Sequence, residues 1–285
     1  FINYILKNKI SFKKIIIFSR DEFKQFEMQK KLQQDCSSSN YKKIRFFLGD
    51  IRDKERLRQA FRDVDIVIHA AALKQVPAAE YNPTEFVKTN VIGTQNIVEV
   101  SLDSNVEKVI SLSTDKACSP INLYGATKLC ADKIIISGNN IKGKQNILFA
   151  AVRYGNVFNS RGSVVPEFHK QKKKGTLNIT HKNMTRFNIF LDEAIKMVLW
   201  TCKNAIGGEI VIPKIPSFFI YDLAKIIAPS SKIKIVGIRD GEKIDEILIS
   251  KSESRNTLDI GNYYILSDSK NVQDYYAKKK RVKYF

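Results

Sequence analysis

Short apolar runs alternate with longer amphipathic stretches through the first half of this 285-residue chain. The runs are rich in Ile, Val, Phe and Leu and predict buried strands over residues 14–18, 44–48, 65–70, 108–112 and 147–152. Between them the apolar positions follow the spacing of one helix face. Strands that alternate with helices form a parallel sheet covered by helices. The pattern therefore predicts an α/β fold with a doubly wound parallel sheet.

The rhythm changes after Tyr154, where Gly155, Asn156 and Gly162 introduce turns and a basic helix runs to Lys174. The remaining predicted elements are strands over residues 176–180 and 209–212 and helices over 194–202, 220–228 and 241–249. The helix over 194–202 returns the chain to the first sheet, and the helices over 220–228 and 241–249 belong to a smaller lobe. The pattern thus predicts a second, smaller α/β unit.

Composition is that of an ordinary globular protein, with 44% hydrophobic and 27% charged residues. No apolar run approaches the roughly 18–20 residues that span a bilayer, and the first residues do not read as a cleaved signal peptide. We therefore expect a cytoplasmic protein with no membrane partner. The cysteines lack Cys-x-x-Cys spacing and stand at positions 36, 118, 130 and 202, so we expect free thiols and no metal site.

The chain is strongly basic, with a formal net charge of +19, and its densest basic runs are residues 170–174 and 278–281. Such charge suits nucleic acid, an anionic membrane surface or a phosphorylated small molecule. No nucleic-acid-binding motif or aromatic stacking platform accompanies it. We therefore interpret most of the charge as a solvated surface and expect no nucleic-acid partner.

The densest group of chemically competent side chains lies in residues 112–128. Asp115 and Lys116 follow the fourth predicted strand, at the carboxyl end where open α/β sheets bind ligands. Tyr124 and Lys128 are four apart and share one face of a helix. A neighbouring ammonium favours phenolate and lowers the pKa of a tyrosine. The segment is thus predicted to bring a strand-end acid and base to face a tyrosine–lysine pair.

Further motifs stand in order along the chain: Ser19-Arg20-Asp21-Glu22-Phe23-Lys24-Gln25-Phe26-Glu27-Met28, Gly49-Asp50-Ile51-Arg52-Asp53, His69-Ala70-Ala71-Ala72, Tyr154-Gly155-Asn156-Val157, Arg161-Gly162-Ser163-Val164-Val165-Pro166 and Met184-Thr185-Arg186-Phe187. Together with the central segment, this series resembles the extended short-chain dehydrogenase/reductases. Within them it is most similar to the inverting UDP-N-acetylglucosamine 4,6-dehydratases of pseudaminic acid synthesis. The resemblance covers nearly the whole chain.

This resemblance implies a Rossmann-type dinucleotide-binding domain, a substrate-binding lobe and a homo-oligomer. The dinucleotide-binding domain would comprise residues 1–155 and 188–213, and the substrate-binding lobe residues 156–187 and 214–285. The chain opens without the first strand and glycine-rich turn of such a domain, so we expect both ends to be clipped. Loss of a central strand exposes the backbone groups of its neighbours, so we expect this chain alone to be poorly stable and to bind dinucleotide weakly.

What remains of the cofactor site favours NADP over NAD. After the second strand of such a fold, a NAD enzyme presents a carboxylate to the ribose, whereas Ser19 and Arg20 offer a hydroxyl and a guanidinium suited to a 2′-phosphate. Arg20 could instead be a surface ion-pair partner. The remaining cofactor residues implied by the resemblance are Asp50, Ile51, Ala70, Ala71, Ala72, Lys74, Asn90, Tyr124 and Lys128.

The resemblance also implies catalytic roles. Tyr124, with its phenolate favoured by Lys128, would take the proton of the 4-hydroxyl as hydride leaves carbon 4 for NADP. Asp115 would be the acid toward the hydroxyl on carbon 6, and Lys116 the base at carbon 5. We expect burial and the Lys128 cation to keep Lys116 partly neutral. Thr114 would orient the substrate, unless it only caps its own turn.

Arginine and amide side chains in the second half of the chain are implied to hold the UDP moiety of the substrate, since the guanidinium fork matches phosphate oxygens. The implied residues are Asn156, Arg161, Arg186, Arg239 and Glu242. Departures from the family pattern at Gln75, Asn188, Asp240 and Asp245 lie on this substrate side.

Three alternatives stay open. The chain could be another nucleotide-sugar dehydratase, a 4-epimerase, which needs no Asp-Lys pair for elimination, or a non-catalytic binding protein drawn to polyanions. Membrane-anchored, non-inverting 4,6-dehydratases resemble the same segment but tend to carry methionine where Tyr124 stands, so the tyrosine favours the inverting type.

Overall fold

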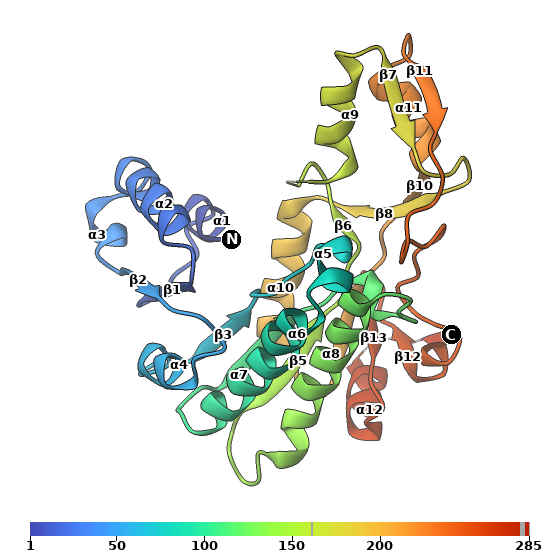
Figure 1. The fold of residues 1–285 in the computed structure, drawn as a ribbon. Helices are drawn as coiled ribbons and strands as arrows, with labels where there is room; N and C mark the ends of the chain where they lie inside the picture. The colour runs from blue at the N-terminus through green and yellow to red at the C-terminus, as the bar shows by residue number, and fades with distance from the viewer. Residues whose placement is uncertain (161, 280–282, 285) are drawn as a thin grey trace.

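The chain, described by a computed structural model over residues 1–160, 162–279 and 283–284, is organised around one large sheet. Its strands lie in the order β14-β12-β13-β9-β5-β4-β3 (Figure 1). Their bounds are β3 (Ile66–His69), β4 (Lys108–Leu112), β5 (Leu148–Val152), β9 (Ile210–Pro213), β12 (Thr257–Asp259), β13 (Tyr263–Leu266) and β14 (Lys283–Tyr284). Strands β3, β4, β5 and β9 run parallel, as predicted for the first half of the chain.

Strands β12 and β13 add an antiparallel edge to this sheet, because β13 pairs with β9 and β12 pairs with β13. The sequence predicts that residues 214–285 belong to the smaller lobe, but β12, β13 and β14 lie in the large sheet. The reason is a pairing across about fifty residues of chain, between Tyr263–Leu266 and Ile210–Pro213, which hydrophobic periodicity does not reveal.

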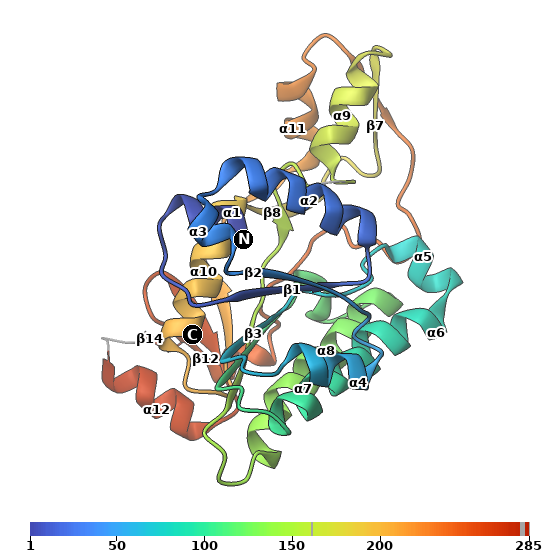
Figure 2. The same cartoon turned by 90° about the vertical axis from the view of Figure 1, so that its left-hand side faces the viewer.

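Helices cover both faces of the large sheet. Val109 and Phe149 point to the face packed by α7 (Gly93–Leu102) and α8 (Leu123–Ile141). Their neighbours Ile110 and Ala150 point to the opposite face, where α10 (Leu191–Asn204) packs, and Figure 2 shows α10 and α8 on opposite sides. This alternation is the two-residue period of a strand buried on both faces. The prediction of a strand-and-helix α/β architecture is confirmed.

The other helices and helical turns of the larger body flank these layers. They are α1 (Ile2–Lys7), α2 (Glu22–Asp35), α3 (Ser38–Tyr41), α4 (Lys54–Ala60), α5 (Val76–Tyr81), α6 (Pro83–Phe86), the π-helical turn η1 (Val87–Ile92), the 3-10 turns η2 (Asp115–Ala117) and η3 (Glu253–Asn256), and α12 (Lys270–Lys279).

The first two predicted strands do not join the large sheet. Strands β1 (Ile15–Ser19) and β2 (Ile44–Leu48) pair only with each other among the described residues, and they form a separate parallel pair (Figure 1). Strand β3 begins the large sheet on the other side of a cavity that both pieces line. This division sets the position of the cavity described below.

The smaller lobe is built from elements on both sides of α10. They are β6 (Asn156–Val157), α9 (Val164–Lys172), β7 (Thr176–Ile179), β8 (Thr185–Ile189), β10 (Ser217–Phe219), α11 (Ile220–Ile227) and β11 (Lys232–Ile235). Its core contains Phe168, Leu177 and Ala224, and α9, α11, β7 and β11 lie together at one end of the molecule in Figure 1. Within the described residues, no helix combines the length and apolar character needed to cross a membrane.

The predicted helix over residues 241–249 is wrong, because this segment is irregular. Gly241 has φ +72°, outside helical geometry, and the Ile244 carbonyl accepts the backbone N–H of Thr185 in β8. The Arg186 side chain also donates to the carbonyls of Lys243 and Ile244. These carbonyls are therefore used by β8 and are not available for helical hydrogen bonds.

Candidate active site

The Asp-Lys pair lies at the carboxyl end of β4, as predicted. The chain leaves the strand through Ser113, whose N–H donates to Val152 O at 2.7 Å, and the Asp115 N–H donates to Tyr154 O at 3.1 Å. Residues Asp115–Ala117 then form the 3-10 turn η2, which Thr114 caps by accepting from Lys116 N at 3.4 Å. The edge of the sheet and the cap together fix where Asp115 and Lys116 stand.

Lys116 lies between two carboxylates. Its Nζ is 3.0 Å from Asp115 Oδ1 and 3.2 Å from Glu246 Oε1, and the exposed fractions of the Asp115 and Glu246 side chains are 0% and 4%. The Thr114 hydroxyl also donates to Asp115 Oδ1, at 2.9 Å. Burial disfavours the Lys116 ammonium, but the two carboxylates outweigh it and raise the pKa of Lys116. The expectation of a partly neutral Lys116 is wrong for this arrangement, because it left Glu246 out.

Tyr124 and Lys128 share the inner face of α8, and both are buried. The helix starts at Asn122, whose side chain accepts from Gly125 N at 2.8 Å. Burial raises the pKa of Tyr124, with the nearby Thr114 hydroxyl opposing the shift. Lys128 donates to Leu112 O at 2.8 Å, and burial lowers the pKa of this lysine. The expectation that Lys128 lowers the pKa of Tyr124 is therefore wrong for the structure without ligands, because desolvation dominates.

A close approach of α8 to η2 depends on Gly125, since a Cβ there would collide with the backbone carbonyl oxygen of Lys116. We expect Gly125→Ala to push the helix from the turn and to destabilise the protein by about 1–3 kcal/mol. Because the displacement separates Tyr124 from Asp115, activity should fall more than stability alone explains. Thermal unfolding and turnover of Gly125→Ala check this, with Asn140→Ala, at an exposed position of the same helix, as control. An unchanged turnover of Gly125→Ala would contradict it.

A cluster of buried charged side chains lies beside the residue that follows β4. Arg153, 1% exposed, donates to Glu253 Oε1 at 2.9 Å and to Leu248 O at 3.1 Å, and its Nη2 lies 3.5 Å from Asp132 Oδ2. Asp132 in turn accepts from the hydroxyl of Ser113 at 2.6 Å. Cluster members therefore come from α8, from η3 and from the residues that follow β4 and β5.

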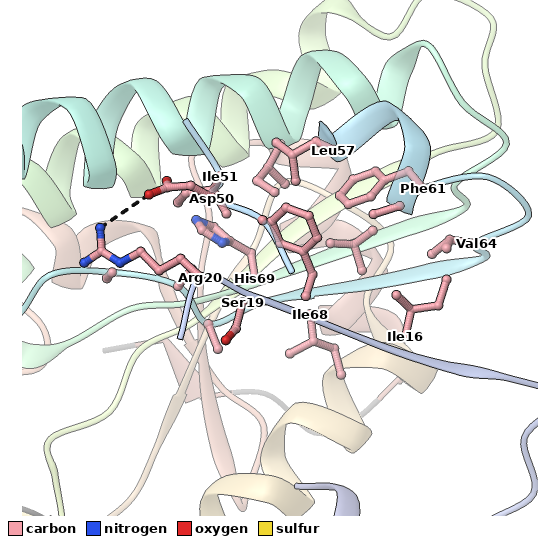
Figure 3. A pocket seen from close by; sticks show the side chains of 18 of the residues that line it. Ile16, Ser19, Arg20, Asp50, Ile51, Leu57, Phe61, Val64, Ile68 and His69 are labelled. Carbon is pink, nitrogen blue, oxygen red and sulfur yellow. Dashed lines mark hydrogen bonds and ion pairs between the residues drawn. The ribbon is translucent and has the colours of Figure 1, made fainter. Parts of the chain in front are cut away.

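A cavity of about 580 Å³ separates β1 from β3 (Figure 3). It is lined by seven of the predicted cofactor residues, namely Ser19, Arg20, Asp50, Ile51, Ala70, Ala71 and Ala72. Figure 3 shows Arg20 directed toward Asp50, with an apolar wall that includes Leu57 and Phe61. The cavity thus brings together polar groups from the carboxyl ends of β1, β2 and β3.

At the polar end of the cavity, two arginines share the carboxylate of Asp50. Arg20 Nη1 lies 3.4 Å and Arg52 Nη2 2.8 Å from the same Asp50 oxygen. Burial opposes ionisation of Asp50, but its bonds to Arg52 hold the pKa of this carboxyl below its usual range. Arg20 is 51% exposed and can leave Asp50 paired with Arg52, so its guanidinium is available to an anion.

Four predicted cofactor residues lie outside this lining: Tyr124 and Lys128 of α8, described above, and Lys74 and Asn90. Lys74 is exposed in the loop after β3. Asn90 is buried and holds that loop in place, because its amide donates to Leu73 O at 2.9 Å and to Thr127 Oγ1 at 3.0 Å, and its oxygen accepts from Leu73 N at 2.8 Å. Asn90 therefore links the loop to α8, which carries Tyr124 and Lys128.

The predicted substrate residues are placed unequally. Arg186 is 7% exposed, and its guanidinium donates to the carbonyls of Thr185, Lys243 and Ile244 and lies 3.4 Å from Glu242. It therefore anchors the segment over residues 241–249 in this structure. Arg239 is exposed and its N–H donates to Glu242 at 3.4 Å. Asn156 stands in β6, and Arg161 lies outside the described residues.

Sequence reasoning missed Glu246 and the cluster of Asp132, Arg153 and Glu253. A signal for Asp132 existed, since it stands four residues after Lys128 on the same helix face. Glu246 lies in the segment over residues 241–249, for which a helix is predicted, so the sequence did not indicate its contact with Lys116. Cys118, one of the cysteines predicted to be free thiols, is buried against Glu253, and burial raises the pKa of its thiol to about 12.

The parallel sheet, the strand-end Asp-Lys pair and the Tyr-x-x-x-Lys helix together define an extended short-chain dehydrogenase/reductase. More narrowly, the chain belongs to the polysaccharide biosynthesis protein family, whose profile matches residues 1–268.

Three relatives show how close this kinship is. The chain is 54% identical over 258 residues, which are 90% of this chain and 75% of the relative, to a UDP-N-acetylglucosamine 4,6-dehydratase (inverting) of Campylobacter jejuni subsp. jejuni serotype O:2. It is 42% identical over 91% of its length, and 76% of the relative, to a UDP-glucose 4-epimerase of Rickettsia bellii. The X-ray structure of Pen from Bacillus thuringiensis matches with a TM-score of 0.87 and 37% identity, over 93% of this chain and 85% of that one.

Proposed function

We propose that this protein catalyses the NADP-dependent 4,6-dehydration of UDP-N-acetylglucosamine with inversion at carbon 5. The product is a UDP 4-keto-6-deoxy-L-arabino-hexulose for surface glycan, specifically pseudaminic acid, synthesis. The observation that carries the proposal is the buried Asp115–Lys116 pair at the end of β4, next to Tyr124 of α8. The named activity of the Campylobacter relative, at 54% identity, supports the choice of sugar and outcome.

The residues present fit a nicotinamide dinucleotide. Ser19, Arg20 and Asp50 offer polar groups at one end of the cavity, and Ala70, Ala71 and Ala72 are exposed and small, so a ligand can approach their backbone. Tyr124 and Lys128 would hold the ribose next to the nicotinamide. When bound, the dinucleotide supplies a reversible hydride acceptor that takes hydride from carbon 4 and returns it to carbon 6.

The roles of the chain's residues follow from which group gives and which group takes each proton in the reaction. Tyr124 takes the proton of the 4-hydroxyl as that carbon is oxidised, and Thr114 stabilises the phenolate and orients the sugar. The resulting ketone acidifies the carbon 5 proton, which Lys116 removes in its amine form. Asp115, in its acid form, protonates the carbon 6 hydroxyl, the carbon–oxygen bond breaks and water leaves with a carbon 5–carbon 6 double bond formed.

Asp115 and Lys116 together hold the same number of protons before and after this step. The resting pair holds one proton, on Lys116, and a shift of that proton across 3.0 Å to Asp115 creates the acid and the base together. After elimination, Lys116 carries the carbon 5 proton and Asp115 is again a carboxylate. A proton from solvent then reaches carbon 5 on the opposite face, which gives inversion, and Tyr124 returns the 4-hydroxyl proton to solvent.

The smaller lobe is proposed to bind the UDP moiety. Arg239, Asn156 and Arg161 are proposed as its phosphate ligands, because guanidinium and amide groups donate to phosphate oxygens. Arg186 and Glu242 serve this site by ordering the segment that carries Arg239, since their side chains are bonded to that segment. The assembly is proposed to be a homo-oligomer.

The choice of NADP rests on Arg20. We expect Arg20→Ala to weaken NADP⁺ binding about 10- to 100-fold, because a charge-assisted hydrogen bond to phosphate contributes about 1.5–3 kcal/mol. NAD⁺ affinity should change by less than about threefold. Calorimetric titration with both dinucleotides checks this, with exposed Arg62→Ala, which removes the same charge outside the cavity, as control. Equal losses for NADP⁺ and NAD⁺ would show that Arg20 does not read the 2′-phosphate.

The proposed function is tested on the protein extended at its N-terminus by a first strand and glycine-rich turn. This protein is incubated with UDP-N-acetylglucosamine and NADP⁺ in deuterated water, and the sugar is followed by NMR. We expect a 4-keto-6-deoxy sugar with deuterium and inverted configuration at carbon 5. Retained configuration would assign a non-inverting dehydratase. A sugar altered only at carbon 4 would assign an epimerase, the activity named for the Rickettsia relative. An unchanged sugar would refute this substrate.

A further inference from the structure

Glu246 is the buried charged group nearest the proposed catalytic pair that the mechanism above leaves unused. It reaches the site from the irregular segment over residues 241–249, far in sequence from η2. Its Oε1 lies 3.2 Å from Lys116 Nζ, and its Oε2 lies 3.9 Å from Lys243 Nζ. Among the described residues, Oε2 of Glu246 and Oδ2 of Asp115 are buried without a hydrogen-bond partner.

The contact between Lys116 and Glu246 is largely buried and so differs from a surface ion pair. The exposed fractions of the Lys116 and Glu246 side chains are 20% and 4%, so water screens their attraction weakly. The charged groups that face Lys116 are Asp115 from its own turn and Glu246 from the smaller-lobe segment. Lys243 faces Glu246 from the other side and donates to Cys118 O at 2.7 Å, which fixes the segment against η2.

We propose that Glu246 is a positioning residue for the catalytic pair: its carboxylate holds the Lys116 ammonium beside Asp115 and keeps the pair in its singly protonated form. This inference rests on the proposed dehydratase function. The reactive pair needs one shared proton, because a pair without protons has no acid for the carbon 6 hydroxyl. Glu246 therefore protects activity at alkaline pH, where Lys116 would otherwise lose its proton to water.

The same contact couples chemistry to the smaller lobe. Glu246 stands three residues after Lys243 and two after Ile244, whose carbonyls bind Arg186. The charge environment of Lys116 thus depends on where the segment over residues 241–249 lies. Any displacement of that segment removes one of the two carboxylates that stabilise the ammonium.

The first test needs neither substrate nor cofactor. Trace acetylation of lysines by acetic anhydride over a range of pH, read by mass spectrometry, gives the titration midpoint of Lys116. In Glu246→Gln we expect this midpoint to fall by at least about one pH unit, since an opposite charge within about 4–6 Å shifts a pKa by about 1–3 units. Glu246→Asp should lie between Gln and the natural residue.

Asp245→Asn is the matched control. Asp245 is adjacent and exposed, and it accepts from the Thr185 hydroxyl at 2.6 Å, so its replacement perturbs the same segment without touching Lys116. We expect it to leave the Lys116 midpoint unchanged. A Lys116 midpoint that is the same in Glu246→Gln as in the natural protein would overturn the inference. Equal shifts in Asp245→Asn and Glu246→Gln would also overturn it, because they would assign the effect to the segment.

The second test is the pH profile of turnover. In Glu246→Gln the alkaline fall of kcat should move to lower pH by the same amount as the Lys116 midpoint, with KM within about threefold. A uniform loss of kcat at every pH would mean a purely structural role. If the natural protein makes no 4-keto-6-deoxy sugar, the proposed function fails by itself, and the acetylation result still decides whether Glu246 sets the charge of Lys116.

Discussion

Replacing Asp115 with asparagine is expected to lower the rate of UDP-N-acetylglucosamine dehydration by about a thousandfold. Positioned general acids contribute about 10²- to 10⁴-fold, and the amide has almost the same shape but cannot donate a proton to the leaving hydroxyl. The buried Oδ1 contacts to Thr114 and Lys116 are retained in part by the amide oxygen. NMR detection of the 4-keto-6-deoxy product under single-turnover conditions measures the loss.

The same substitution at Asp222, an exposed residue of α11 in the smaller lobe, is the matched control and should leave turnover within about twofold. Circular dichroism of Asp115→Asn separates lost chemistry from lost folding. Retention of more than a tenth of the natural rate by a folded Asp115→Asn would show that another group protonates the leaving hydroxyl.

Local sequence patterns sufficed wherever burial on both faces of a strand decided the structure. The runs Lys108–Leu112 and Leu148–Val152 are buried at most of their positions, as central parallel strands require, and both were predicted to within one residue of their observed ends. The site at the end of β4 followed from the same rule, because open α/β sheets place ligands there. These features depend on residues close together in the chain.

Interactions between distant residues could not be predicted in this way. Residues 241–249 have apolar spacing that suits a helix, but β8 takes their carbonyls through Thr185 and Arg186. Glu246 reached Lys116 only because of that irregular path. Likewise, β13 joined the large sheet through pairing with β9, which leaves no mark on either segment alone.

The electrostatics of the site likewise combine features that local sequence predicts with features that depend on distant contacts. Helical spacing correctly placed Tyr124 and Lys128 on one face of α8. It could not reveal that both would be buried, or that the Lys128 ammonium would bind Leu112 O. A cation that is itself desolvated and held by a carbonyl stabilises a phenolate less than one directed at it, so burial governs the pKa of Tyr124 until ligands change the site.

Replacing Arg153 with methionine is expected to destabilise the protein by about 3–5 kcal/mol, because removal of one member of a buried ion pair leaves the other charges unpaired. Asp132 and Glu253 would keep their burial and lose the guanidinium that now lies 3.5 and 2.9 Å away. At about 2–4 °C per kcal/mol for a protein of this size class, the unfolding temperature should fall by on the order of 10 °C. Calorimetric or circular dichroism melting of Arg153→Met measures it.

The control for this loss is Arg153→Met combined with Asp132→Asn and Glu253→Gln, which removes the unpaired charges as well. Because these groups form one network, the three substitutions should not add, and the combined variant should melt above Arg153→Met. Arg153→Met melting at the natural temperature would show that solvent already screens the cluster. Since Asp132 also binds Ser113 and Arg153 binds Leu248 O, the single variant should loosen both the end of β4 and the segment that carries Glu246. Its turnover, measured well below its melting temperature, should therefore fall further than that of the combined variant, in which the neutral side chains can still pack together.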